Sequence, residues 1–186
     1  MRPFFSIWIK PTETFKYLEE RRLAGKENYI EYLFALVSLS LFLPNINNIS
    51  KLAKSELFGF VISIVFAPVV GLFVFYLISY FVWRIGKILN GKATLAEIQL
   101  VVAYSSIPHL IHLVIALIFI IPAIQADNIN LILDQHPITF IVISLFTIRN
   151  LIFGLSYFNK YTYGYAVLNI VILGTIFEAI SLMIKH

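Results

Sequence analysis

Five long apolar runs dominate this 186-residue chain. A helix that crosses the hydrocarbon core of a bilayer needs roughly 20 mostly apolar residues. Four of the runs have that length, and the first reaches it only with the polar residues at its ends. We therefore predict an all-α polytopic membrane protein with five transmembrane helices. The runs lie at about Tyr29 to Leu43, Leu57 to Trp83, Ile98 to Ile121, Pro137 to Leu155 and Tyr163 to Ile184.

The composition and the longest polar stretch agree with this prediction. The chain is 60% hydrophobic and only 13% charged, whereas about 25% of the residues in a soluble domain are charged. The longest polar stretch covers residues 1–28. We predict two parts: a cytoplasmic interfacial arm over residues 1–28 and a single bundle of five transmembrane helices over residues 29–186. The chain has no cysteine, so neither a disulfide nor a zinc-thiolate site can form.

The distribution of basic residues predicts the orientation of the chain. Six of the 14 basic residues precede the first apolar run, three lie between the second and third runs, and two, Arg149 and Lys160, lie in the second half of the fourth run or between it and the fifth. Loops on the cytoplasmic side are enriched in lysine and arginine. The pattern therefore predicts a protein of the plasma (inner) membrane with a cytoplasmic N-terminus and, after five crossings, a C-terminus on the outside.

The arm reads as a short helix at the membrane surface. Pro11 suits the first turn of a helix, and Phe15 and Leu18 follow at a helical spacing that puts them on one face. The apolar residues before Pro11 can enter the headgroup layer, where nearby cations favour anionic lipid. The arm can also pack on the bundle, and the two interpretations are compatible. These apolar residues are Phe4, Phe5, Ile7 and Trp8.

The second apolar run carries small residues at a strict four-residue interval. They are Gly59, Ser63, Ala67 and Gly71. Such a ridge lets a second helix backbone approach closely within a membrane. The sequence leaves two partners open: another helix of the same chain or a second copy, so that a homo-oligomer is one expectation. The bilayer itself is the other predicted partner.

Four ionisable residues within the apolar runs are candidates for function, because such groups are costly in lipid. They are His109, His112, Arg149 and Glu178. Helix geometry at 1.5 Å per residue predicts that they approach one another. Three interpretations are open: a polar network that holds the helices together, a path for a substrate or proton, and a metal site of His109, His112 and Glu178. Two imidazoles alone do not make a zinc site.

The sequence argues against catalysis and nucleic-acid binding. It has no nucleophile elbow, no zinc-binding His-Glu-x-x-His helix and no phosphate-binding loop. The basic residues are spread along the membrane edges rather than gathered on one surface. We therefore expect no enzyme activity, no cofactor and no nucleic-acid partner.

Two segments resemble bacterial members of the Yip family (Ypt/Rab-interacting-protein-like membrane proteins). The first is IWIKPTETFKYL, residues 7–18, with an apolar stretch, a proline and a Thr-Phe pair ahead of the first span. The second is GKATLAEIQLVVAYSSIP, residues 91–108, with a turn, a short amphipathic start and a run that closes on proline. Gly91, Tyr104 and Pro108 are the family-like positions, and their expected roles are a turn, a buried hydroxyl and a kink.

The resemblance implies a five-helix bundle with a cytoplasmic N-terminus, no known cofactor and no established catalytic residues. Eukaryotic relatives act in vesicle trafficking and contact small GTPases. They carry a longer cytosolic N-terminal region that this chain lacks, so we do not extend GTPase binding to it. Two hypotheses remain. The first is a membrane-organising, scaffolding or trafficking-like protein that acts through helix packing and self-association. The second is a small transporter or channel that uses the intramembrane His, Arg and Glu residues.

Overall fold

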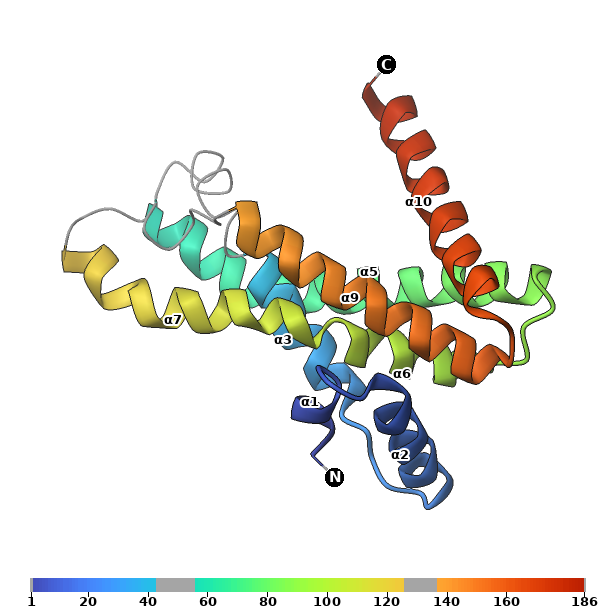
Figure 1. The fold of residues 1–186 in the computed structure, drawn as a ribbon. Coiled ribbons are helices and arrows are strands. Elements are labelled where there is room, and N and C mark those ends of the chain that lie inside the picture. The colour runs from blue at the N-terminus through green and yellow to red at the C-terminus, as the bar shows by residue number, and fades with distance from the viewer. Residues whose placement is uncertain (1, 43–55, 126–136, 186) are drawn as a thin grey trace. The chain divides into compact units, whose positions relative to one another are not determined.

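The computed structural model describes residues 2–42, 56–125 and 137–185, and every regular element within these ranges is helical (Figure 1). This confirms the all-α fold class. In chain order the elements are α1 (Pro3–Ser6), α2 (Pro11–Leu23), α3 (Ile30–Phe42), α5 (Glu56–Ile88), α6 (Leu95–Ser105), the 3-10 helix η2 (Ile107–His109), α7 (Leu110–Gln125), α9 (Pro137–Asn159) and α10 (Tyr163–Lys185).

Four stretches are long and apolar enough to cross a membrane. They are Val65–Ile88, Leu95–Ile115, Ile138–Asn159 and Tyr163–Ile184. The predicted polytopic character is therefore confirmed. The predicted first span differs, because α3 has 13 residues, which corresponds to about 20 Å at the helical rise, and residues 43–55 after it lie outside the described ranges. The structure thus supports four long spans and one shorter apolar helix.

The third predicted span is interrupted near its middle. Helix α6 ends at Ser105, and η2 covers Ile107–His109 before α7 begins at Leu110. Pro108 lies in this 3-10 segment and is buried. Proline has no N–H to donate and its ring displaces the carbonyl one turn earlier, which explains why the helix tightens and restarts here.

The described residues form two compact units. Unit 1 comprises Met1–Asn28, Phe75–Ser105 and Ile148–His186, and unit 2 comprises Tyr29–Val74 and Ser106–Thr147. Within unit 2, α3 packs on η2 and α7, with Phe34 and Val37 fully buried. Within unit 1, the arm packs on α6 and α9 and contributes its own core residues, Phe15 and Leu18, both 0% exposed.

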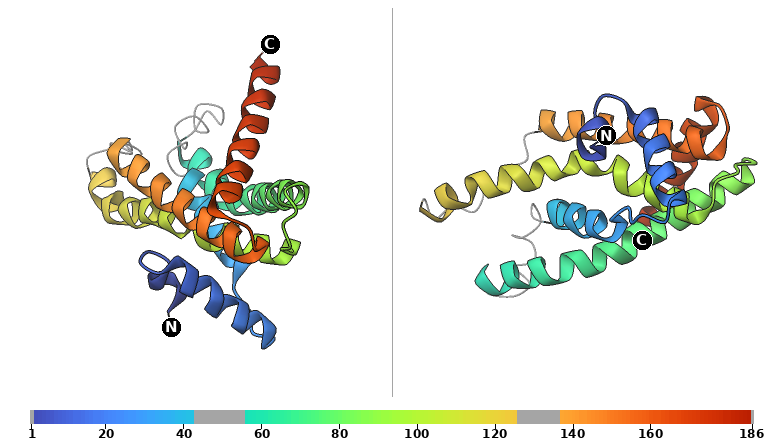
Figure 2. Two further views of the ribbon diagram at one scale, coloured as in Figure 1. Left: turned by 45° about the vertical axis from the view of Figure 1, so that its right-hand side comes forward. Right: turned by 90° about the horizontal axis from the view of Figure 1, so that it is seen from below.

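In unit 1, helix α2 runs beside the last part of α9 (Figure 2). A Cβ atom on Gly154 of α9 would lie 2.8 Å from the Phe15 ring of α2 and 2.6 Å from the Val101 side chain of α6. Gly154 therefore lets three helices meet closely, and it does so because it lacks a side chain. The arm is an integral part of the helical packing of unit 1.

Candidate functional site

The polar residues of unit 1 gather where α5, α6, α9 and α10 begin or end. The C-terminus of α5 is closed by a Schellman motif: Gly91 N–H donates to the Gly86 carbonyl at 2.7 Å, and Asn90 N–H donates to that of Lys87 at 3.1 Å. The residue in the left-handed region is Asn90, with φ 61°. The turn that the sequence assigned to Gly91 is thus made by its neighbour.

Gly91 has a different role, which is to make room for Asn159. A Cβ atom on Gly91 would overlap the Asn159 side chain. Asn159 is 2% exposed; its Oδ1 accepts a hydrogen bond from Ala93 N–H at 3.3 Å, and its carbonyl accepts one from Lys92 N–H at 3.2 Å. This asparagine therefore ties the end of α9 to the turn between α5 and α6.

A second asparagine joins α10 to the same region. Asn169 is fully buried, and its Nδ2 donates to the Val82 carbonyl at 3.1 Å and to the Tyr161 hydroxyl oxygen at 3.3 Å. Asn159 Nδ2 donates to the same hydroxyl oxygen at 3.2 Å. Burial raises the pKa of Tyr161, although these two hydrogen bonds lower it. Tyr161 therefore stays neutral and serves as a shared acceptor.

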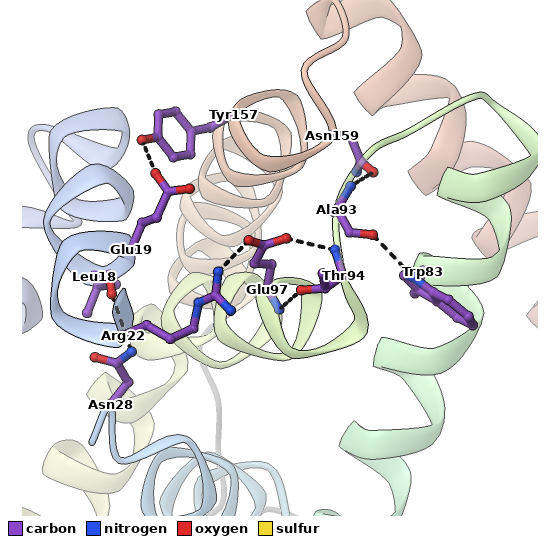
Figure 3. A network of polar contacts seen from close by, with 10 residues as sticks. All are labelled: Leu18, Glu19, Arg22, Asn28, Trp83, Ala93, Thr94, Glu97, Tyr157 and Asn159. Atoms are coloured by element: carbon purple, nitrogen blue, oxygen red, sulfur yellow. Dashed lines mark hydrogen bonds and ion pairs between the residues drawn. The ribbon is translucent and has the colours of Figure 1, made fainter. Parts of the chain in front are cut away.

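Helix α6 begins with a capping box, drawn in Figure 3. Thr94 N–H donates to Glu97 Oε2 at 2.7 Å, and Glu97 N–H donates to Thr94 Oγ1 at 3.3 Å. The same carboxylate accepts a hydrogen bond from Arg22 of α2 through Oε1 at 2.5 Å. Glu97 thus caps one helix and binds the arm.

Three further hydrogen bonds hold the arm. Tyr157 of α9 donates its hydroxyl to Glu19 Oε2 at 2.6 Å (Figure 3). Asn28 Nδ2 donates to the Leu18 carbonyl at 3.3 Å, and the Asn28 carbonyl accepts the hydroxyl of Tyr104 at 3.0 Å. Tyr104 is 5% exposed, so its buried hydroxyl has a partner in the segment that follows α2.

Arg149 also binds the arm. Its Nη1 donates to the Trp8 carbonyl at 3.0 Å, and its Nη2 lies 3.4 Å from that of Ile9. The guanidinium lies 5.5 Å from the centre of the Phe153 ring, a distance at which a cation is attracted to an aromatic face. Arg149 therefore joins α9 to the turn between α1 and α2 through backbone oxygens.

The two histidines lie together in unit 2. The ring centres of His109 and His112 are 6.1 Å apart, and His112 stacks on Phe140 at 6.5 Å. His109 Nδ1 and His112 Nε2 are buried and have no hydrogen-bond partner among the residues that the structure describes. Arg149 and the last candidate, Glu178, belong to unit 1, whereas the two histidines belong to unit 2. The grouping of all four side chains therefore stays a prediction.

That last candidate, Glu178, is exposed on α10. It lies with Gly174, Thr175, Ala179 and Leu182 along a shallow depression of the helix surface. A Cβ atom on Gly174 would meet no atom within 4 Å. Within the described ranges, no group of three His, Asp or Glu side chains is arranged to hold a metal ion.

The small-residue ridge is described in part. Ala67 is 1% exposed, and a Cβ atom on Gly71 would overlap the Ser38 side chain of α3. These two positions therefore pack within unit 2. Gly59 and Ser63 fall on the first part of α5, where their side chains lie outside the described part of the structure.

Sequence reasoning missed the buried asparagines because it considered ionisable groups alone. Asn150, Asn159 and Asn169 are each 0–2% exposed, and amides in a membrane span are costly without a partner. The presence of Asn150 and Asn169 in apolar runs, and of Asn159 shortly after one, was a usable signal. The capping box could also be recognised in the sequence, because Thr94 and Glu97 form a Thr-x-x-Glu pattern ahead of an apolar run.

The comparisons with known proteins agree with this arrangement. The sequence matches the family model of the Yip1 domain over residues 5–184. The match includes the arm as well as the spans, as the packing of unit 1 leads one to expect. No curated protein and no solved structure matches the chain significantly. A bacterial origin stays a prediction. The chain belongs to the Yip1-domain family, and it is a multi-pass helical membrane protein associated with the lipid bilayer.

Proposed function

We propose that this protein is a non-enzymatic organiser of the membrane, with a scaffolding or trafficking-like role that depends on helix packing and self-association. It resides in the plasma (inner) membrane with its N-terminus in the cytoplasm and its C-terminus outside. It uses no cofactor. The distribution of basic residues supports the orientation, and the Yip1-domain match supports a membrane role without a known catalytic site.

The observation that carries self-association is the exposed polar face of α10. Glu178 and Thr175 are exposed there, beside small residues Gly174 and Ala179. A carboxylate at the centre of a membrane helix costs roughly 3 kcal/mol. A helix of a second copy can approach closely along the small residues, exclude lipid from this face and supply hydrogen-bond donors.

Disulfide crosslinking in native membranes tests this face. The chain has no cysteine, so a single Thr175→Cys substitution creates the only thiol. We expect covalent dimers from Thr175→Cys under mild oxidation. Ile180→Cys is the matched control, because Ile180 is also exposed but lies roughly 140° around the helix from Thr175. Equal crosslinking of both variants, or of neither, contradicts the proposed interface.

The unpartnered nitrogens of His109 and His112 favour a second candidate function, a small transporter or channel. Polar groups inside membrane spans often mark substrate or proton paths. His112→Ala and Glu178→Ala, made singly and together, separate the candidates in reconstituted vesicles. Loss of a proton or ion flux with unchanged thermal stability supports transport. Loss of stability with no flux in the parent protein supports the organising role.

A further inference from the structure

The chain from Arg2 to Lys10 is a fixed part of unit 1. Ile7 is 0% exposed, so it points inward and not, as the sequence suggested, into the headgroup layer. Thr14 Oγ1 lies 2.8 Å from both the Ser6 hydroxyl and the Lys10 carbonyl oxygen, and Lys10 N–H donates to the Ser6 carbonyl at 2.7 Å. The segment therefore presents its outer side chains from a defined backbone.

Those outer side chains combine apolar and basic groups. Phe4, Phe5 and Ile9 are 42%, 64% and 76% exposed. Arg2 and Lys10, at the two ends of the segment, are also exposed. Segments that bind at a lipid surface show this combination, because apolar side chains enter the acyl boundary while cations meet anionic headgroups.

Arg149 adds a cation that has no carboxylate partner among the described residues. Its contacts are the carbonyls of Trp8 and Ile9 and the ring of Phe153. Carbonyl oxygens satisfy two of its five N–H donors, but they do not neutralise its charge. A half-buried cation beside apolar surface is stabilised by an anion that can reach it.

Arg149 lies midway along α9, at the point where the exposed large apolar side chains of this helix, which run from Ile138 to Ile148, come to an end. It lies eight residues before Tyr157, or about 12 Å at the helical rise, and Tyr157 bonds with the charged residue Glu19. On its other side Ile148 is 43% exposed. Arginine and tryptophan favour the boundary between hydrocarbon and headgroups, a depth that suits the contact between Arg149 and Trp8.

We propose that Arg149 and the segment Arg2–Lys10 bind the headgroup of an anionic phospholipid, whose acyl chains lie against Phe5, Ile9 and Ile148. Charge complementarity selects the anionic lipid. Its phosphate meets the guanidinium of Arg149, whereas a zwitterionic lipid also brings a cation toward Arg2 and Arg149. The carboxylate of Glu13, which contacts this segment, is already paired with Lys10 at 3.3 Å. The site does not depend on self-association.

Trp8 is a built-in reporter of this site. The chain has two tryptophans, so Trp83→Phe leaves Trp8 as the only one. The full chain is reconstituted in phosphatidylcholine bilayers with a small fraction of phosphatidylglycerol that carries brominated acyl chains, which quench tryptophan fluorescence. We expect stronger quenching than from the same fraction of brominated phosphatidylcholine. Equal quenching by the two lipids would overturn the proposal.

Substitutions in the same background locate the site. Arg149→Gln should weaken the preference for phosphatidylglycerol by about tenfold, the effect of losing one charge-assisted hydrogen bond. Arg84→Gln is the matched control, because Arg84 is an exposed arginine beside the Tyr80 ring, which this background retains. Phe5→Ser, which leaves every cation in place, should also reduce quenching. An undiminished preference in Arg149→Gln, with its helical content intact, would refute the assignment.

Discussion

Helix α6, which is the first part of the span Leu95–Ile115, and helix α10 both belong to unit 1, but they differ in their surroundings. On α6, Ile98, Leu100 and Val101 are 0% exposed. On α10, burial is confined to the first turns around Asn169, and Met183 and Ile184 near its end are 80% exposed. One helix is surrounded by protein, whereas the other is fixed at one end and presents the rest of its surface outward.

The polar residues of the two helices follow the same division. Glu97 and Tyr104 on α6 both have partners on the arm, Arg22 and Asn28, whereas Glu178 on α10 is exposed. Lipid and a protein interior are about equally apolar, so burial between helices depends on packing and hydrogen bonds rather than on hydrophobicity. The same kind of substitution should therefore change the stability of the protein more where helices pack around α6 than on the exposed surface of α10.

The largest difference is expected from adding one methyl group at a glycine. Gly154→Ala places a Cβ atom 2.6 Å from the Val101 side chain of α6 and 2.8 Å from the Phe15 ring. Overpacking of this kind costs about 3 kcal/mol at the upper end of its usual range. Thermal unfolding of the purified protein in detergent measures the loss.

Gly174→Ala is the control on α10, where the new atom meets nothing within 4 Å. Alanine is favoured over glycine in a helix by up to about 1 kcal/mol, so this variant should be as stable as the parent or slightly more so. A similar loss of stability in both variants would mean that α10 is packed as tightly as α6 and would remove the contrast between them.

The next effect concerns the asparagine that joins the helix ends. Asn159→Ala leaves the N–H of Ala93 without its acceptor and removes a donor to Tyr161. An unsatisfied buried polar group costs about 2 kcal/mol, and the free energy of unfolding should fall by about that amount. Chemical unfolding in mixed micelles gives this value. An unchanged free energy would show that water replaces these bonds.

Much of the fold could be predicted because hydrocarbon restricts a chain so strongly. Backbone groups in lipid must bond within their own helix, so the apolar runs themselves predict helices, as Val65–Ile88 and Tyr163–Ile184 show. Pro108 likewise predicted a kink, because proline removes a donor wherever it stands. Neither prediction required information about which helices pack against each other.

The contacts of the polar residues could not be predicted in this way. Arg149 binds two backbone carbonyls. Since every residue has a backbone carbonyl, the sequence does not indicate which ones accept its hydrogen bonds. Gly91 was expected to form a turn, but its lack of a side chain serves Asn159, 68 positions later in the chain. Such roles depend on residues that are close in space but distant in the chain. The length of the apolar runs and the spacing of residues along the sequence do not specify these neighbours.

A smaller effect is expected for the ion pair between the arm and α6. The side chains of Arg22 and Glu97 are 33% and 13% exposed, so a double-mutant cycle of Arg22→Gln and Glu97→Gln should give a coupling of about 1 kcal/mol. Lys10 and Glu13 provide the matched pair, since both are more than half exposed. Their coupling should be smaller, and salt should weaken it more. Equal couplings would argue that the arm is not held at α6.

The smallest effect should come from Thr175→Val on α10. The Thr175 hydroxyl donates to the Val171 carbonyl of its own helix at 3.0 Å, and that carbonyl already accepts a bond within the helix. Because the side chain is exposed and valine has the same shape, stability should change by no more than about 0.5 kcal/mol. Thermal unfolding in detergent, where the chain is kept monomeric, measures this value without a contribution from self-association. A loss as large as that of Asn159→Ala would place Thr175 in a packed interface of the monomer, and α10 would then resemble α6.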